Sequence, residues 1–252
     1  MDISTSSMIV AGGSRGLGLA VAEALCARGA SVTIVARDRA RLDAAQARLP
    51  VAVEQADVTD AAAAGGLMAR IRPDAVVFAA GAVPPMAPIN EISWADFSAT
   101  WETDARGALV WLQAALNLPL RKGARFLTMS SGAAIGGSPM SGGYGGAKRM
   151  QWLATNYAAA FAEQTGLGIG FQTFVVGQMI GGTAVGDAGA AAYAQQLGIT
   201  PAQFMQRFGK PLTPTDVGEA VARVLQEPAL AAPRALRLRG DDGLVVLEPA
   251  AA

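Results

Sequence analysis

Short apolar runs alternate with longer helical stretches along most of this chain, and this rhythm constrains the fold more than any other feature of the sequence. The runs lie at residues 8–11, 31–36, 51–56, 75–80, 125–130 and 169–176. They are rich in Val, Ile, Phe and Ala and show little polar alternation, which is typical of strands that are buried on both faces. Strands that alternate with helices form βαβ units, so we predict an α/β fold around a mostly parallel sheet.

Helical patterns fill the intervals between these strands, at residues 16–28, 39–49, 61–70, 94–118 and 144–165. Each pattern is followed by a Gly, a Pro or a charged break, as is usual where helices end. A last helix should begin at Thr215 or Asp216 and end before Pro228. Asp242 and Gly243 predict a turn between two final short strands.

The length of 252 residues suits one large α/β domain or two small ones. No internal repeat and no linker-like stretch divides the chain, so we predict a single domain over residues 1–252. Residues 177–210 break the strand–helix rhythm with apolar side chains among many Gly and Ala residues. A long insert after a strand is usually functional, and we predict that 177–210 forms a substrate lid.

Charge and composition argue against several classes of function. Twenty Lys and Arg balance twenty Asp and Glu without any block of like charge, so neither nucleic acid nor a membrane surface is an expected partner. The chain has no histidine and one cysteine, so we expect no Ser-His-Asp triad, no disulfide and no metal site. No apolar run reaches the ~18 residues of a membrane span and the start of the chain lacks basic residues, so a cytoplasmic protein is expected.

A glycine-rich turn follows the first strand and opens a helix. Residues 11–18 read Ala-Gly-Gly-Ser-Arg-Gly-Leu-Gly. Glycines at this place let the backbone approach a pyrophosphate at the N-terminus of a helix, although close packing of strand and helix also selects glycine. The predicted cofactor contacts in this turn are Gly12, Ser14, Arg15, Gly16, Leu17 and Gly18.

Residues that follow the second and third strands indicate which cofactor is favoured. Arg37 stands where an NAD-binding site usually places an acid, and with Arg15 it suits a 2′-phosphate, so NADP(H) is favoured over NAD(H). Both arginines are alternatively solvated surface cations. Asp57 and Val58 follow the third strand, where Asp57 either accepts a hydrogen bond from adenine or caps the next helix.

Three side chains then predict proton chemistry. Tyr144 and Lys148 are four residues apart at the start of a helix, so they lie on one face, where the ammonium favours a phenolate and can also bind the cofactor ribose. An unperturbed tyrosine has a pKa of ~10 and needs such a neighbour to act near neutral pH. Ser131, at the carboxyl end of the fifth strand, can hold a substrate carbonyl oxygen.

Taken together, these residues resemble the short-chain dehydrogenase/reductase family in its compact single-domain form. The likeness in order and spacing runs from about Met8 to Gln226. It implies a Rossmann-like doubly wound sheet flanked by helices on both faces, a nicotinamide cofactor, and reversible hydride transfer to or from a carbonyl or alcohol carbon. It also implies Tyr144 as proton donor or acceptor, Ser131 as carbonyl orienter and Lys148 as ribose binder.

This sequence departs from the family pattern at three places. Ala80 and Gly81 stand in a segment that lacks the usual Asn of Asn-Ala-Gly, with Gly81 preserving the backbone approach to the cofactor. Asp104 replaces the Asn of the family's proton relay, and an ionised Asp104 near Lys148 would offset part of the ammonium's effect on Tyr144. A Val-Gly pair replaces Pro-Gly after the sixth strand, where the expected carboxamide contacts are Gly177, Met179 and Thr183.

We therefore predict an NADP(H)-dependent carbonyl reductase whose substrate is small to medium in size and largely apolar, because the lid residues and the residues expected around the cleft are mostly apolar, the latter being Val83, Pro84, Pro85, Met86 and Met140. A cofactor-binding sensor or scaffold of the same fold with weak chemistry is the alternative, which Asp104 motivates. An adenosylmethionine-dependent methyltransferase is a weaker reading, because it gives Ser131, Tyr144 and Lys148 no joint role. Apolar residues on two faces of the helix from Tyr144, and the family's habit, predict a homodimer or homotetramer.

Overall fold

A single twisted sheet forms the centre of the molecule in a computed structural model that describes residues 1–118 and 120–247. Within these residues, eight strands lie in the order β3-β2-β1-β4-β5-β6-β7-β8, and the last pair alone is antiparallel. The strands are β1 (Ser7–Ala11), β2 (Ser31–Ala36), β3 (Val51–Gln55), β4 (Ala75–Phe78), β5 (Arg125–Ser131), β6 (Gly170–Val176), β7 (Ala235–Arg239) and β8 (Gly243–Val246). The predicted mostly parallel α/β sheet is confirmed, including the final hairpin at Asp242 and Gly243.

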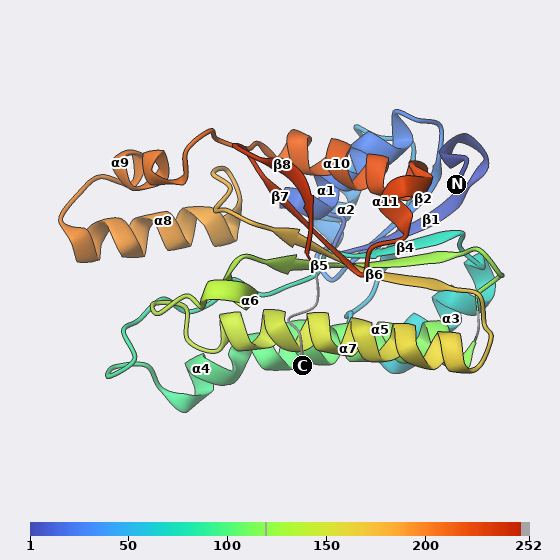
Figure 1. The fold of residues 1–252 in the computed structure, drawn as a ribbon, viewed down its shortest axis with the longest axis horizontal. Coiled ribbons are helices and arrows are strands. Elements are labelled where there is room, and N and C mark those ends of the chain that lie inside the picture. Colours follow the sequence, from blue (N-terminus) through green and yellow to red (C-terminus); the bar gives the residue numbers. More distant parts are fainter. Residues whose placement is uncertain (119, 248–252) are drawn as a thin grey trace.

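Helices cover both faces of this sheet (Figure 1). One face carries α1 (Gly16–Cys26), α2 (Arg39–Gln46), α10 (Pro214–Gln226) and α11 (Pro228–Ala231), and the other carries α3 (Ala61–Ile71), α4 (Trp94–Thr100), α5 (Arg106–Asn117) and α7 (Tyr144–Gln164). Two apolar cores result. Val10, Val21 and Val221 belong to the core under α1 and α10, whereas Phe78, Trp111 and Phe126 belong to the core under α3, α5 and α7.

Short polar caps fix where several helices begin. The side chain of Asp60 accepts hydrogen bonds from the N–H groups of Ala62 and Ala63 at the start of α3. The expectation that Asp57 caps this helix was wrong, because Asp57 lies in the preceding turn. The last helix begins at Pro214, slightly before the predicted start, because Thr213 and Asp216 form a capping box with each other's backbone.

The long helix predicted at residues 94–118 is interrupted in the structure. A π-helical turn at Trp101–Ala105 separates α4 from α5, and Asp104 lies inside it. Such turns have wider i→i+5 hydrogen bonding and are frequent at functional sites. The pattern of apolar residues over 94–118 did not reveal this interruption, because apolar residues continue on both sides of the inserted residue.

The predicted lid emerges beyond the carboxyl ends of the strands. Residues 177–210 contain α8 (Ala184–Leu197), α9 (Pro201–Met205) and a short 3₁₀ turn at Gln206–Phe208. In Figure 1, α8 and α9 project past the sheet on the side to which β5 and β6 point. The small α6 (Ala133–Gly136) follows β5 at the same end. Across the described residues, no helix combines the length and apolar character that a membrane crossing requires.

Candidate active site

A cavity of about 680 Å³ opens at the carboxyl ends of β1, β2, β4, β5 and β6. It extends from the glycine-rich turn at one end to the predicted lid at the other. In doubly wound sheets this edge is where ligands bind, because the loops diverge at the point where the strand order reverses, here between β1 and β4. All of the predicted site residues except Asp57 line this cavity.

Different glycines of the glycine-rich turn serve different purposes. Two of them allow close packing of the backbone, and a third leaves space for a ligand. A Cβ on Gly12, whose φ is +86°, would lie 2.6 Å from Ala80 Cα, and one on Gly18 would lie 2.2 Å from the carbonyl oxygen of Gly12. A Cβ on Gly16, whose φ is +55°, would meet no protein atom within 4 Å. Gly16 therefore faces open space at the start of α1, where no side chain caps the first N–H groups.

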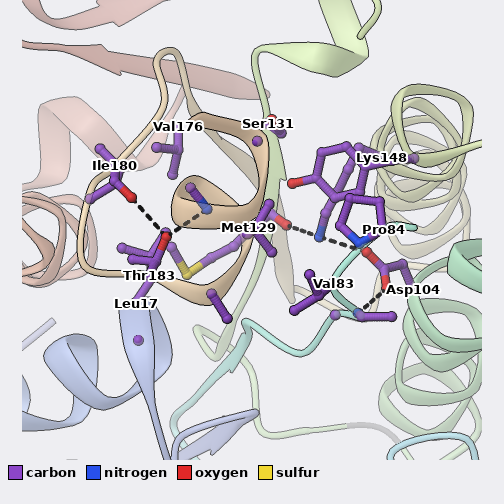
Figure 2. Close-up of a pocket in the computed structure, with 18 of the residues that line it drawn as sticks. Leu17, Val83, Pro84, Asp104, Met129, Ser131, Lys148, Val176, Ile180 and Thr183 are labelled. Carbon is purple, nitrogen blue, oxygen red and sulfur yellow. Dashed lines mark hydrogen bonds and ion pairs between the residues drawn. The ribbon is translucent and has the colours of Figure 1, made fainter. Parts of the chain in front are cut away.

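This open helix start fits an anionic group such as a pyrophosphate. Uncapped N–H groups at a helix N-terminus carry partial positive charge and point outward along the helix axis. Leu17 and Ser14 line the cavity beside them, and Leu17 lies opposite Val83 in the close-up view (Figure 2). The local chain thus has the donors and the space that the predicted cofactor requires.

Positive side chains gather at the far end of this turn. Arg15, Arg37 and Arg41 all line the cavity. Arg41 was missed in the sequence, although its spacing of four from Arg37 was the available signal. Two carboxylates share this end: Arg41 Nε lies 3.2 Å from Asp38 Oδ2, and Arg37 Nη1 lies 3.5 Å from Asp57 Oδ2.

Asp57 sits just behind this cluster rather than on the cavity wall. Its side chain accepts hydrogen bonds from the N–H and the hydroxyl of Thr59, each at 2.8 Å. The backbone hydrogen bond from Thr59, followed by its hydroxyl and the guanidinium of Arg37, holds the pKa of Asp57 below its ordinary value. Its contact with adenine stays a prediction, while Val58 lines the cavity and accepts from Trp111 through its carbonyl oxygen.

Tyr144 and Lys148 lie on the first turns of α7, with their side chains toward the cavity. They are 9% and 7% exposed, respectively, and Lys148 Nζ lies 5.7 Å from the centre of the Tyr144 ring. Lys148 Nζ also donates to the carbonyl oxygen of Met129 at 3.4 Å. The expected adjacency of phenol and ammonium is thus present in the structure.

Asp104 comes from the π-helical turn and completes this cluster. It is fully buried, its Oδ1 accepts from the N–H of Ala82 at 2.7 Å, and its Oδ2 lies 3.2 Å from Lys148 Nζ (Figure 2). Burial alone would lower the pKa of Lys148, but attraction to Asp104 and Tyr144 outweighs it and raises this pKa above the ordinary lysine value. Lys148 is therefore held charged, beside a carboxylate that offsets its field.

Two neighbouring serines at the end of β5 take different places. Ser131 lines the cavity, and its hydroxyl oxygen accepts from the N–H of Ala133 at 3.2 Å. Ser130 also lines the cavity but is buried, and its hydroxyl is engaged, donating to the carbonyl oxygen of Lys148 at 2.9 Å. Ser131 is thus available to a ligand, whereas Ser130 fixes helix α7 to the sheet.

The segment after β6 forms the next part of the wall. Gly177, Met179 and Thr183 all line the cavity. Thr183 caps α8, because its hydroxyl donates to the carbonyl oxygen of Ile180 at 2.8 Å and accepts from the N–H of Gly186 at 3.0 Å (Figure 2). The neighbouring Gln178 also lines the cavity.

Apolar side chains line the remaining wall. Val83, Pro84 and Met86 line it as expected from the sequence, whereas Pro85 and Met140, which were expected there too, lie outside it. Residues of the predicted lid also contribute, namely Gly189, Tyr193, Phe204 and Phe208. The apolar character of this segment was visible in the sequence, but which of its aromatic side chains would turn toward the strand ends was not.

Comparison with known proteins relates the chain to oxidoreductases. The model of a family described as enoyl-(acyl carrier protein) reductase matches residues 11–229. The short chain dehydrogenase/reductase AacuD of Aspergillus aculeatus is 28% identical over 163 residues, a match that covers 61% of this chain and 57% of that protein. The match to this curated relative thus spans little more than half of its length.

Solved structures share the fold over nearly the whole chain. An NAD⁺-bound xylitol dehydrogenase superposes with a TM-score of 0.83 at 18% identity and covers 95% of this chain and 100% of its own. A variant of actinorhodin polyketide ketoreductase with NADPH superposes with a TM-score of 0.79 at 21% identity, covering 94% and 97%. At these identities the likeness concerns the fold, and the two structures carry different nicotinamide cofactors.

Proposed function

This chain belongs to the short-chain dehydrogenase/reductase family, and we propose that it is an NADP(H)-dependent reductase of small to medium, largely apolar carbonyl compounds. Its family consists of oxidoreductases that act on alcohol or carbonyl groups and bind a nicotinamide cofactor. The observation that carries the finer proposal is one cavity that holds Ser131, Tyr144 and Lys148 beside an uncapped helix start.

In this proposal, each of the three side chains has one task. A bound nicotinamide supplies the hydride that adds to the carbonyl carbon, or accepts it in the reverse direction. Tyr144 donates the proton that the carbonyl oxygen requires, and Ser131 holds that oxygen through its hydroxyl. Lys148 binds the ribose with its remaining donor and stabilises the phenolate that Tyr144 leaves behind.

The preference for NADP(H) rests on the cationic end of the cavity. Arg15, Arg37 and Arg41 line the region beyond the helix start, where a 2′-phosphate would lie. A guanidinium binds phosphate oxygens in a bidentate manner, which a ribose hydroxyl of NAD(H) does not match. Two nearby acids, Asp38 and Asp57, weaken this preference without reversing the sign of the cluster.

A cofactor-binding sensor with weak chemistry is the second candidate, because of the buried ion pair between Asp104 and Lys148. The carboxylate offsets the positive charge that Tyr144 needs when it gives up its proton. Turnover distinguishes the two candidates, since both bind the cofactor.

The test begins with fluorescence titration of NADPH and NADH, followed by NADPH consumption with aldehydes, ketones and quinones. We expect tighter binding of NADPH and measurable turnover that falls on the order of 1,000-fold in Tyr144→Phe, because a positioned proton donor contributes roughly that factor. Tight binding without turnover of any substrate supports the sensor instead. Failure to bind either cofactor contradicts both candidates.

Exposed apolar side chains on α5 and α7 support the proposed homodimer or homotetramer. Tyr157 and Phe161 on α7 are 64% and 49% exposed, and Leu109 on α5 is 48% exposed. These side chains gain stability when a second copy covers them. Light scattering should give at least twice the chain mass, whereas a monomeric mass at micromolar concentration contradicts this proposal.

A further inference from the structure

The lid side of the cavity carries aromatic rings and few free polar atoms. From this we propose that the substrate is an uncharged ketone or aldehyde whose body contains an aromatic or conjugated ring, and that Tyr193 determines this specificity. The inference rests on the proposed function, because it names the substrate class of the same site. Its two supports are the aromatic wall of the lid and the way in which the polar groups of the wall are already bonded.

Three rings from α8, α9 and the turn after them form an aromatic wall, which consists of Tyr193, Phe204 and Phe208. The Tyr193 and Phe204 rings are nearly parallel, with centres 5.3 Å apart and planes at 7°. Phe204 meets Phe208 edge-on, with centres 5.6 Å apart and planes at 81°. All three line the cavity, so a flat ring entering it can extend the stack in either geometry.

Hydrogen bonds fix the Tyr193 ring relative to the reacting end of the site. Its hydroxyl bonds with Ser138 Oγ at 2.9 Å and accepts from the N–H of Met140 at 3.2 Å. The same short segment continues into α7, where the N–H of Tyr144 donates to the carbonyl oxygen of Ser141 at 3.0 Å. The wall is therefore held at a set position relative to the proposed proton donor, which is how a site selects a body shape.

Most polar groups on this side are already satisfied within the protein. The amide of Gln178 donates to the carbonyl oxygen of Lys210 and accepts from the N–H of Gly240. Thr183 and Ser138 are likewise bonded, to Ile180 and Tyr193 among others.

Few polar groups remain for a ligand. In the described part of the chain, no hydrogen bond reaches the Tyr144 hydroxyl, Ser131 Oγ accepts from one N–H alone, and the hydroxyl of Thr103, next to Asp104, is also without a hydrogen bond. A substrate body that lies against the aromatic wall therefore finds few polar partners away from its carbonyl oxygen, so further hydroxyl groups there would be buried without hydrogen bonds.

The distribution of charged residues around the cavity also favours an uncharged substrate. Among the described residues that line the cavity, the charged ones are Arg15, Arg37, Asp38 and Arg41 near the glycine-rich turn, and the paired Asp104 and Lys148. The cluster near the turn is taken up by the cofactor in the proposed function. A phosphate or carboxylate on the substrate would thus lose its hydration without gaining a counter-ion.

The experiment compares kcat/KM, with NADPH, for four carbonyl probes. β-Tetralone and methyl octyl ketone have the same number of carbon atoms, but one is a fused ring ketone and the other an open chain. Fructose and levulinate test added hydroxyl groups and added charge. We expect β-tetralone to exceed methyl octyl ketone on the order of 10-fold, because each ring pair contributes roughly a factor of 2 to 10. Fructose and levulinate should fall at least about 100-fold below β-tetralone.

Variants test whether the wall is the cause. Tyr193→Leu should reduce the ratio between β-tetralone and methyl octyl ketone to about 1–2, whereas Tyr193→Phe, which keeps the ring, should retain most of it. Phe208→Leu, at a half-buried position, gives a second measurement should Tyr193→Leu fold poorly. Trp94→Leu is the matched control, because Trp94 stacks on Phe97 with centres 5.8 Å apart but neither residue lines the cavity.

The outcomes separate this inference from the proposed function. Equal kcat/KM for the two ketones, an unchanged ratio in both Tyr193→Leu and Phe208→Leu, or fructose or levulinate matching β-tetralone overturns the inference while the reductase stands. No NADPH consumption with any probe, despite NADPH binding, overturns the proposed function as well. A ratio that falls in Tyr193→Leu and Phe208→Leu but not in Trp94→Leu supports the aromatic wall.

Discussion

Two buried cations lie at opposite ends of strand β5, and they differ in what surrounds them. Lys148 Nζ lies near the carboxyl end, 3.2 Å from the Asp104 carboxylate and on the wall of the cavity. Arg125 begins the strand and donates to the carbonyl oxygen of Val224 at 2.7 Å and to Gln172 Oε1 at 2.5 Å. Burial lowers the pKa of Arg125 to about 10, whereas attraction to its neighbours raises that of Lys148 despite burial.

The comparison teaches that a cation's role follows from its partners and from the space in front of it. Val224 lies in the last turn of α10, where carbonyl oxygens lack partners within the helix, so Arg125 satisfies one of them. Gln172 in turn donates to the carbonyl oxygens of Leu230 and Pro233. Arg125 therefore joins the sheet to its covering helices, while Lys148 keeps one donor free toward the cavity.

Replacing Lys148 should lower both activity and stability and gives the largest expected effect. A second substitution, at Asp104, should then separate the two. Lys148→Met should lower kcat/KM on the order of 100-fold or more and destabilise the fold by roughly 3 kcal/mol, because it leaves Asp104 as a buried charge without a partner. Adding Asp104→Asn should recover most of the stability and none of the activity. Urea unfolding together with NADPH consumption provides both readings.

The double variant is also the control for this first prediction. Should Lys148→Met retain full stability, the ion pair would be structurally neutral and the role given to Asp104 would fail. Should the double variant regain activity, Lys148 would have no part in the chemistry.

Replacing Arg125 should destabilise the fold without lowering activity, and its effect should be slightly smaller than that of replacing Lys148. Arg125→Met should destabilise the fold by roughly 2–3 kcal/mol, since it leaves the carbonyl oxygen of Val224 and Gln172 Oε1 buried without a donor. We expect kcat/KM with NADPH to stay within about 2-fold of the parent, because Arg125 lies at the far end of the strand from the cavity. A large change in kcat/KM at unchanged stability would break the distinction between the two cations.

Asp104→Asn should shift the pH profile, which is the smallest of the three effects. Removing the carboxylate leaves the charge of Lys148 uncompensated, so the Tyr144 phenol gives up its proton more readily. The alkaline limb of kcat/KM for reduction, where this proton donor is lost, should therefore move down by about one pH unit. The pKa of Lys148 should fall as well, since burial is then opposed by Tyr144 alone, and this moves the alkaline limb in the same direction. A profile that stays in place or moves upward would contradict the role proposed for Asp104.

Stability should not follow this profile near neutral pH. Because the pKa of Lys148 is raised in the folded chain, its stabilising contribution is fully present below the ordinary lysine value of about 10.4 and is lost only as pH rises through the folded value. Melting temperatures of the unaltered chain measured around neutral pH should therefore be constant with respect to this group. A change there would indicate another titrating residue.

Much of the carboxyl end was predictable from the sequence, because its chemistry depends on local spacing. Tyr144 and Lys148 share a helix, and Ser131 ends a strand, so their proximity follows from periodicity and from where parallel strands end. The approach of Asp104 to Lys148 was anticipated as well, although the π-helical turn that carries it was not.

Contacts between distant segments were not predictable in the same way. Tyr193 bonds to Ser138 across 55 positions, and Arg125 bonds to Val224 across 99. Nothing local in the sequence distinguishes Arg125 from a surface arginine, since its burial depends on how α10 crosses the start of β5. The aromatic wall and the structural arginine therefore required the folded chain.

The π-helical turn at Trp101–Ala105 also determines how α4 is rotated relative to α5 about the helix axis. It adds a residue to the turn, so the faces of α4 and α5 are offset by about 100° from those of an uninterrupted α-helix. Without this offset, a helix packed on the sheet through Trp111 would present a different residue to Lys148. Deletion of Ala105, the residue between Asp104 and α5, should therefore rotate Asp104 by about 100° relative to α5 and away from Lys148.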